Sequence, residues 1–144
     1  MGFGQNLAII LGMKENELSK VILEAAFQVH TRLGPGLLET VYEVILAYEL
    51  RKRGLSVERQ RSIPIRYDNM IFDEGFRADL MVDDCVMVEL KSIEALAPVH
   101  AKQVLTQLRL SERKLGFLMN FGEVHLKNGL KRIVNGLPEE PVAL

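Results

Sequence analysis

The order of hydrophobic and polar residues divides the chain into a helical first part and a second part rich in strands. Apolar residues recur at helical spacing over residues 16–33, and Asn16 is predicted to cap this helix. The Gly-Pro-Gly segment at residues 34–36 ends the pattern sharply. A second helix is predicted over residues 37–53, because the apolar stripe resumes and Gly54 suits the position that follows a helix end.

The pattern then changes to the two-residue alternation typical of β-strands. Strands are predicted at residues 56–67, 76–82, 86–91 and 115–121, a helix at 98–113, and a last strand or turn at 123–136. Pro64 favours an edge position for the first strand, and Asp68-Asn69 is expected to be a turn. The segment 86–121 forms a strand–helix–strand crossover, which predicts a parallel, right-handed connection. The fold class is therefore α/β (mixed α+β), on a mixed central sheet.

Length and composition limit the classes of protein that fit this pattern. The chain has 144 residues, 48% hydrophobic and 26% charged, which predicts one globular domain over residues 1–144. Residues 1–13 are expected to form an N-terminal arm and residues 137–144 a C-terminal tail. The net charge of −1 excludes a generally polycationic nucleic-acid binder, although it allows a local basic groove.

Cysteine usage and apolar runs bear on the compartment. A single cysteine, Cys85, excludes an intramolecular disulfide and a cysteine-rich zinc site, and no base partner is visible for nucleophilic catalysis. No apolar run approaches the ~20 residues of a membrane span, and residues 7–13 make a poor signal peptide. We therefore expect a soluble, cytoplasmic protein with no membrane partner.

The predicted hairpin of residues 76–82 with 86–91 is the most informative part of the sequence. Apolar residues should share one face, and directly opposed residues lie on the same face. A three-residue loop at 83–85 satisfies this condition, whereas a two-residue loop would mix the faces. The expected apolar pairs are Val82 with Val86, Leu80 with Val88, and Ala78 with Leu90.

The same register brings charged side chains together. It sets Asp79 opposite Glu89, with β-carbons ~5 Å apart, and Arg77 opposite Lys91. Opposed carboxylates repel, so a neighbouring positive charge is expected. A divalent cation such as Mg²⁺ is one candidate. A surface square of four charges with Arg77 and Lys91 is the other, and the pattern alone favours it.

Three separated motifs give the chain a resemblance to a known family. Asp79 followed by Val88-Glu89-Leu90-Lys91 resembles the D…E-x-K signature of the PD-(D/E)xK nuclease superfamily. Residues 36–42 (GLLETVY) resemble the motif that names the GxxExxY proteins, a bacterial group within that superfamily. His100, Gln103 and residues 120–122 (NFG) are also similar to that group. The resemblance implies a restriction-endonuclease-like αβββαβ core with an extra N-terminal helix.

The chain departs from the family pattern at two positions. Ala78 precedes Asp79, where the superfamily's name has a proline. Related nucleases often carry Q-x-x-x-Y on the helix after the lysine, whereas this chain has Gln103 and Gln107. An aromatic role at the second of these positions is therefore not expected.

The resemblance implies roles for individual residues. Asp79, Glu89 and Glu39 would be ligands of Mg²⁺ or Mn²⁺, since hard oxygen donors suit these ions. The catalytic residues would be Asp79, Glu89, Lys91 and Gln103. The supporting or substrate-binding residues would be Tyr42, His100, Arg77 and Gln107. Each has an ordinary alternative, because acids are favoured in the first turn of a helix and a tyrosine is often a core residue.

The resulting hypothesis is a Mg²⁺-dependent nuclease that hydrolyses phosphodiester bonds, with DNA favoured over RNA as substrate. The alternative is a catalytically weak or inactive nuclease-fold binding module for nucleic acid or a protein. A homodimer formed through the apolar residues 3–13 is a further possibility. Basic residues cluster at 51–53, 59–66 and 109–114, and could line a groove or only solubilise the surface.

Overall fold

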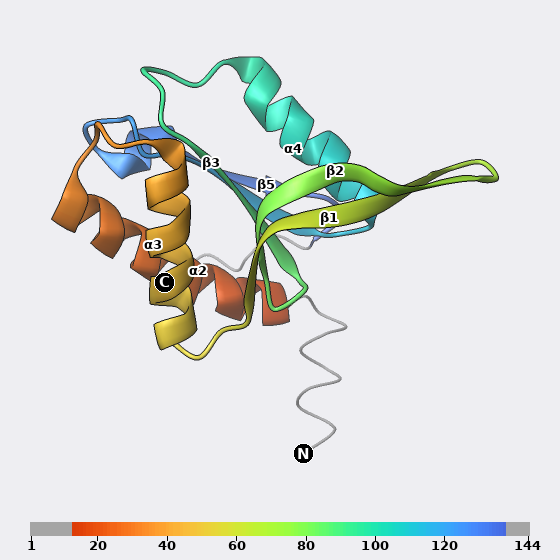
Figure 1. The fold of residues 1–144 in the computed structure, drawn as a ribbon, viewed down its shortest axis with the longest axis horizontal. Coiled ribbons are helices and arrows are strands. Elements are labelled where there is room, and N and C mark those ends of the chain that lie inside the picture. The colour runs from red at the N-terminus through yellow and green to blue at the C-terminus, as the bar shows by residue number, and fades with distance from the viewer. Residues whose placement is uncertain (1–12, 138–144) are drawn as a thin grey trace.

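A computed structural model of the chain describes residues 13–137. Three helices, five strands and a short 3-10 helix follow one another along this part of the chain (Figure 1). They are α2 (Met13–Leu33), α3 (Glu39–Lys52), β1 (Val57–Tyr67), β2 (Met70–Val82), β3 (Val86–Lys91), α4 (Pro98–Ser111), β4 (Leu115–Asn120), η1 (Leu126–Gly129) and β5 (Leu130–Val134). The strands form one sheet in the order β1-β2-β3-β4-β5. Only β3 and β4 pair in parallel, so the predicted mixed α/β, restriction-endonuclease-like fold is confirmed.

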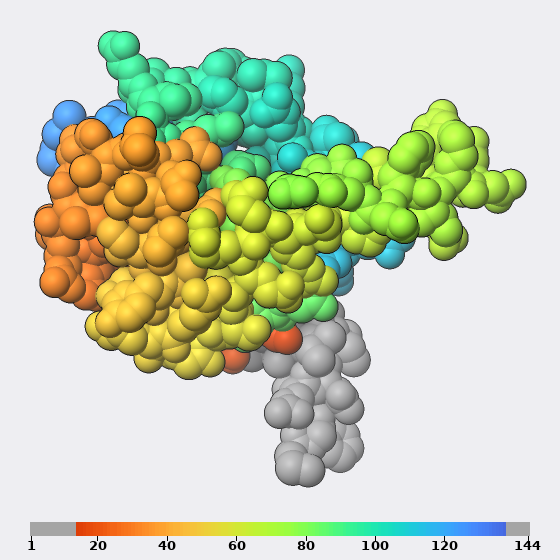
Figure 2. All heavy atoms as spheres, in the orientation of Figure 1, coloured from red at the N-terminus to blue at the C-terminus, as the bar shows by residue number. Residues whose placement is uncertain are grey.

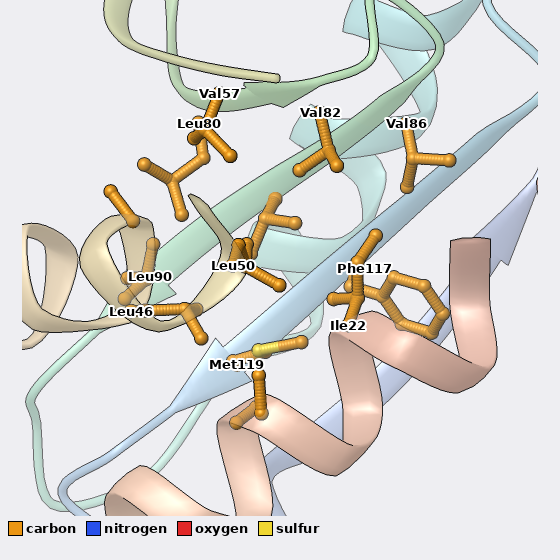
Figure 3. Packing of buried hydrophobic residues seen from close by; sticks show 14 of the residues in the cluster. Ile22, Leu46, Leu50, Val57, Leu80, Val82, Val86, Leu90, Phe117 and Met119 are labelled. Atoms are coloured by element: carbon orange, nitrogen blue, oxygen red, sulfur yellow. The ribbon is translucent and has the colours of Figure 1, made fainter. Parts of the chain in front are cut away.

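The helices cover the sheet from both sides. In Figure 1, α2 and α3 lie on one face and α4 on the other. Figure 3 shows Ile22 of α2 and Leu46 and Leu50 of α3 packed over sheet residues such as Leu90 and Met119. A smaller cluster, which includes Leu108, lies between α4 and the opposite face. The centre of the sheet, which contains the parallel pair, is therefore buried on both faces.

Several predicted boundaries differ from the observed ones. Asn16 lies inside α2 rather than at its N-cap, and its side chain accepts a hydrogen bond from Arg132 on β5 at 2.8 Å. Leu137, expected in the tail, is buried in the core. Residues 1–12 and 138–144 lie outside the described part of the chain, and so does most of the arm proposed to dimerise. Among residues 13–137, no helix is both long enough and apolar enough to cross a membrane.

The β1–β2 hairpin is much longer than the sequence predicts. The turn at Asp68-Asn69 is confirmed, but β2 already begins at Met70, so the hairpin projects from the body of the molecule (Figures 1 and 2). Residues at the hairpin tip remain exposed although several are apolar; Ile71, for example, is 61% exposed. The prediction of a later start was wrong because it relied on alternating burial, which this projecting segment lacks.

Strands β1 and β2 change faces halfway along their length. Val57 packs with α2 and α3, whereas Ile63 packs with α4. Residues separated by an even number of positions should share a face of a regular strand. Gln60, midway between them, has a φ of 51°, in the left-handed region. This residue interrupts the regular alternation of β1.

The partner strand switches at the same level. Leu80 belongs to the cluster under α2 and α3, but Ala78 belongs to the cluster under α4. The prediction that these two share a face was therefore wrong. The register does not shift at this level, with Arg59 opposite Leu80 and Arg61 opposite Ala78; it shifts only further along, between Ile63 and Ile65. Asp79 thus lies where both strands change faces, and its side chain belongs to neither apolar cluster.

Candidate active site

Two carboxylates meet where β2 and β3 separate. The strands pair from Val82↔Val86 to Leu80↔Val88, which confirms the predicted three-residue loop, and no pair follows within the described sheet. Beyond that point the Leu90 N–H donates to Oδ2 of Asp79 at 3.0 Å. The Asp79 carboxylate therefore takes the place of a backbone acceptor, next to Glu89 on β3. Asp79 is buried and Glu89 half-buried.

The electrostatic state of this pair is unusual. Burial, followed by a side-chain hydrogen bond to Asp79 and the charge of Asp79, raises the pKa of Glu89 to about 9, against the lowering effect of Lys91. At neutral pH Glu89 therefore keeps a proton and can share it with Asp79. A divalent cation can replace that proton, because both side chains offer hard oxygen donors.

Glu39 lies close to the pair but does not complete a metal cluster. It occupies the first turn of α3, and its side chain is exposed. The pKa of Glu39 is raised by burial and then by the charge of Asp79, while Lys91 lowers it. Within residues 13–137 no group of three or more His, Cys, Asp or Glu side chains is arranged to hold a metal. Asp79 and Glu89 fit Mg²⁺, which often takes one or two carboxylates and keeps its waters.

Lys91 ends β3 beside the two acids. It is half-buried, and among the described residues it takes part in no ion pair. The expected square of four charges is wrong. Because β2 and β3 separate before the level of Lys91, Arg77 is exposed and pairs with Glu74 instead. The Lys91 ammonium is thus available to an incoming anion.

The backbone that follows Lys91 is held by β4. The Lys91 carbonyl accepts from the Phe121 N–H at 2.8 Å. The fully buried Asn120 accepts from the Ile93 N–H and donates to the Ile93 carbonyl, both at 3.0 Å, and its Oδ1 also accepts from the Gly122 N–H at 3.0 Å. A β-carbon on Gly122 would lie 2.1 Å from the Ile93 oxygen. The Asn-Phe-Gly motif therefore fixes the backbone that leaves β3 (the exit of β3), and with it the position of Lys91.

Tyr42 supports the loop before α3 rather than Glu39. Its hydroxyl donates to the Gly34 carbonyl at 2.5 Å and accepts from the Leu37 N–H at 3.2 Å. The ring is fully buried and stacks on Phe121, with centroids 4.7 Å apart. Ser92, just after Lys91, donates to the Leu37 carbonyl at 2.6 Å. These contacts give Tyr42 a role in placing the start of α3.

The predicted residues of α4 take separate positions. Nδ1 of His100 accepts from the Ala97 N–H at 2.9 Å, so this side chain caps its own helix. Gln103 is exposed. Gln107 is half-buried, and its Oε1 has no hydrogen-bond partner within the described part of the chain. None of the three is hydrogen-bonded to the acids among residues 13–137.

Two neighbours of the acids were missed in the sequence. Oε1 of Glu43, a buried residue of α3, accepts from Nε2 of Gln60 at 2.7 Å, and Oε2 accepts two bonds from Arg59 at 3.0 and 2.8 Å. Nε2 of Gln60 also donates to Oδ1 of Asp79 at 3.1 Å. Glu43 lies one turn after Glu39, so helical spacing could have indicated it. No pattern in β1 marks Gln60.

Most of the clustered basic residues have partners within the protein. Arg53 pairs with Glu49, Arg59 with Glu43, and both Arg61 and Arg113 with Asp84. These side chains therefore stabilise the fold and do not form a ready phosphate groove. Cys85, beside Asp84, is half-buried, and burial raises the pKa of its thiol to about 11, which makes it a poor nucleophile.

Comparisons with known proteins give one match. A family model described as the PD-(D/E)XK nuclease superfamily matches residues 16–133. No curated protein matches the chain, and no solved structure does. The match spans most of the chain and includes all the acidic, basic and amide residues described above. It is a match to the superfamily and does not single out the GxxExxY group.

Proposed function

This chain belongs to the PD-(D/E)XK nuclease superfamily, and on that premise we propose that it is a Mg²⁺- or Mn²⁺-dependent nuclease that hydrolyses phosphodiester bonds. Members of the superfamily generally use divalent metal ions. The observation that carries the proposal is the pair of the buried Asp79 and the half-buried Glu89 beside Lys91, which has no ion-pair partner among residues 13–137. The three groups come from the two strands that carry the family motif.

The residues of the site would have different roles in the reaction. Asp79 and Glu89 would hold the metal ion, and Glu39, whose pKa is raised by burial and then by the charge of Asp79, would bind one of its water molecules. When bound, the ion lowers the pKa of water and offsets negative charge on the phosphate. Lys91 would bind a non-bridging phosphate oxygen or orient the attacking water. Gln103 would reach the substrate from α4, and Tyr42 and His100 would only position the elements.

A cleavage assay on the full chain tests this proposal. Single- and double-stranded DNA and RNA would be incubated with Mg²⁺, with Mn²⁺ and with EDTA. We expect metal-dependent cleavage, with DNA preferred to RNA. Lys91→Ala and Asp79→Asn should each lower the rate by at least ~100-fold, since both act on the reacting phosphate.

The matched control is Lys131→Ala, which removes an exposed lysine of β5. Its rate should equal that of the wild type. Two results would contradict the proposal: no cleavage of any substrate with either ion, or cleavage that survives Lys91→Ala unchanged. Circular dichroism of each variant would show that the fold is intact.

A second candidate function is a nuclease-fold binding module. Both oxygens of Asp79 already accept hydrogen bonds, and no three-group metal cluster is present among residues 13–137. Such a module would bind nucleic acid in a salt-dependent way, and the binding would survive Glu89→Ala. Calorimetric Mg²⁺ binding that this variant abolishes would favour the nuclease instead.

A further inference from the structure

The carboxylate of Asp79 is held by donors from both neighbouring strands. On one side the Leu90 N–H of β3 donates to Oδ2 at 3.0 Å. On the other side Nε2 of Gln60, from β1, donates to Oδ1 at 3.1 Å. The orientation of Asp79 is thus fixed from two directions. Of the two donors, only the Gln60 amide belongs to a side chain.

The Gln60 amide is itself fixed by a second acid. Its Nε2 donates to Oε1 of Glu43 at 2.7 Å as well as to Asp79. An amide nitrogen has two hydrogens, so both are used. A flipped amide would place its oxygen against two carboxylates and is excluded by repulsion. Arg59 holds Glu43 with two hydrogen bonds, so the order of contacts is Arg59, Glu43, Gln60, Asp79.

This arrangement depends on the irregular backbone of β1. Successive side chains of a regular strand point to opposite faces, yet Arg59 and Gln60 both reach Glu43. The φ of 51° at Gln60 brings both side chains to the same side. A left-handed conformation is costly for residues other than glycine, and such costs cluster at functional sites. Here the irregular residue directly contacts a proposed metal ligand.

We propose that Gln60 is a positioning residue, which holds Asp79 in the orientation required to bind the metal ion and is itself held by Glu43 and Arg59. The inference rests on the proposed function, because it assigns Gln60 a role toward the same site. Second-layer partners of metal ligands typically contribute about 10- to 100-fold in metal affinity. The Gln60 amide is expected to contribute at the lower end, because its bond to Asp79 is a single hydrogen bond.

The test is calorimetric titration of the full chain with Mn²⁺ alone, in the absence of nucleic acid. Gln60→Met keeps the volume and the backbone strain but removes the donor, whereas Gln60→Gly removes the side chain and relieves the strain. If the amide positions Asp79, both variants bind Mn²⁺ about 10-fold more weakly. Asp68→Gly is the matched control, since Asp68 also has a φ of 51° but lies at the hairpin tip.

The outcomes separate this inference from the proposed function. Wild-type affinity in Gln60→Met would overturn the role of Gln60 and leave the nuclease proposal standing. Weaker binding in Gln60→Gly alone would assign the effect to the backbone and also overturn it. A wild-type protein that binds no Mn²⁺ would overturn both. Thermal unfolding measured in EDTA distinguishes loss of metal affinity from loss of fold: the proposal expects Gln60→Met to remain folded at the temperature of the titration, with one cooperative transition above it.

Discussion

The two sides of β3 are built in opposite ways. Toward β4, β3 pairs in parallel over its whole length, from Val86↔Leu115 to Lys91↔Asn120. Toward β2, it pairs only as far as Leu80↔Val88. On the β4 side, a buried asparagine makes three hydrogen bonds at the strand exit. On the β2 side, Asp79 and Glu89 lie where the two strands separate.

One side of β3 therefore stabilises the fold, and the other carries the groups of the proposed chemistry. On the β4 side the Asn120 amide is paired with three backbone groups, so it holds the backbone rigidly. The β2 side carries two acids in a partly buried place, and at neutral pH the raised pKa of Glu89 disfavours the folded state. Lys91 lies on β3 between these two sides, and each side affects a different part of the residue. A rigid attachment fixes its backbone, and the open side leaves its ammonium unpaired.

Removal of the attachment on the β4 side should have the largest effect. Asn120→Ala leaves the Ile93 N–H and carbonyl and the Gly122 N–H without their partner. We expect a loss of about 3 kcal/mol in the free energy of unfolding, because unpaired buried groups cost 1–3 kcal/mol each and some regain water. Urea denaturation measures it. Asn128→Ala, at an exposed position of η1, is the control and should change stability little.

Removal of the acid Glu89 on the β2 side should have the opposite effect and raise the stability of the folded protein. The pKa of Glu89 is about 9 in the folded protein, against an ordinary value of 4.5. Between these pH values the unfolded chain ionises and the folded one keeps its proton, so stability falls as pH rises. Below pH 4.5 and above pH 9 the contribution of Glu89 to the slope disappears.

Glu89→Gln should therefore stabilise the apoprotein at alkaline pH. We expect about 2 kcal/mol at pH 8 and almost nothing at pH 4, measured by thermal unfolding in EDTA. The control is Glu94→Gln, because Glu94 is an exposed glutamate just beyond β3. Equal pH profiles for Glu89→Gln and the wild type would show that the two sides of β3 do not differ in this way.

Tyr42 offers the smallest and most local test. Tyr42→Phe keeps the stacking on Phe121 but removes the bonds to Gly34 and Leu37. We expect a loss of about 1 kcal/mol, with the nuclease rate lowered only a few-fold because the start of α3 shifts. Tyr48→Phe, at an exposed tyrosine of the same helix, should leave both unchanged. A rate that falls as far as in Lys91→Ala would assign Tyr42 to the chemistry itself.

The sequence predicted most of the fold and the two strands that carry the acids. The loop of β2 and β3 was confirmed because apolar pairs such as Val82 with Val86 allow only one loop length. The predicted face of Ala78 was wrong. Alternation assumes a regular backbone, and the left-handed residue in β1 interrupts that regularity. A glutamine at φ 51° gives no signal in a hydrophobicity pattern.

The contacts of side chains were harder to predict than the elements. Arg77 was paired with Lys91 by extending the strand register, but the register ends before it. Tyr42 was expected to support the site or to bind substrate, whereas the partners of its side chain are the loop before α3 and Phe121, which follows β4. Spacing along one element indicates which residues share its face. It does not show which loop packs against that face.

The parallel pairing of β3 with β4 also sets an order for folding. The strands that carry Asp79 and Glu89 are joined by a three-residue loop, so the two acids meet as soon as the β2–β3 hairpin forms. Asn120 reaches Ile93 only after the whole of α4 has crossed the sheet, and closing that longer loop costs more entropy. We expect the acids to be brought together early in folding, and the rigid exit of β3 to form late. Lys91 would then be the last of the three motif residues to reach its final place.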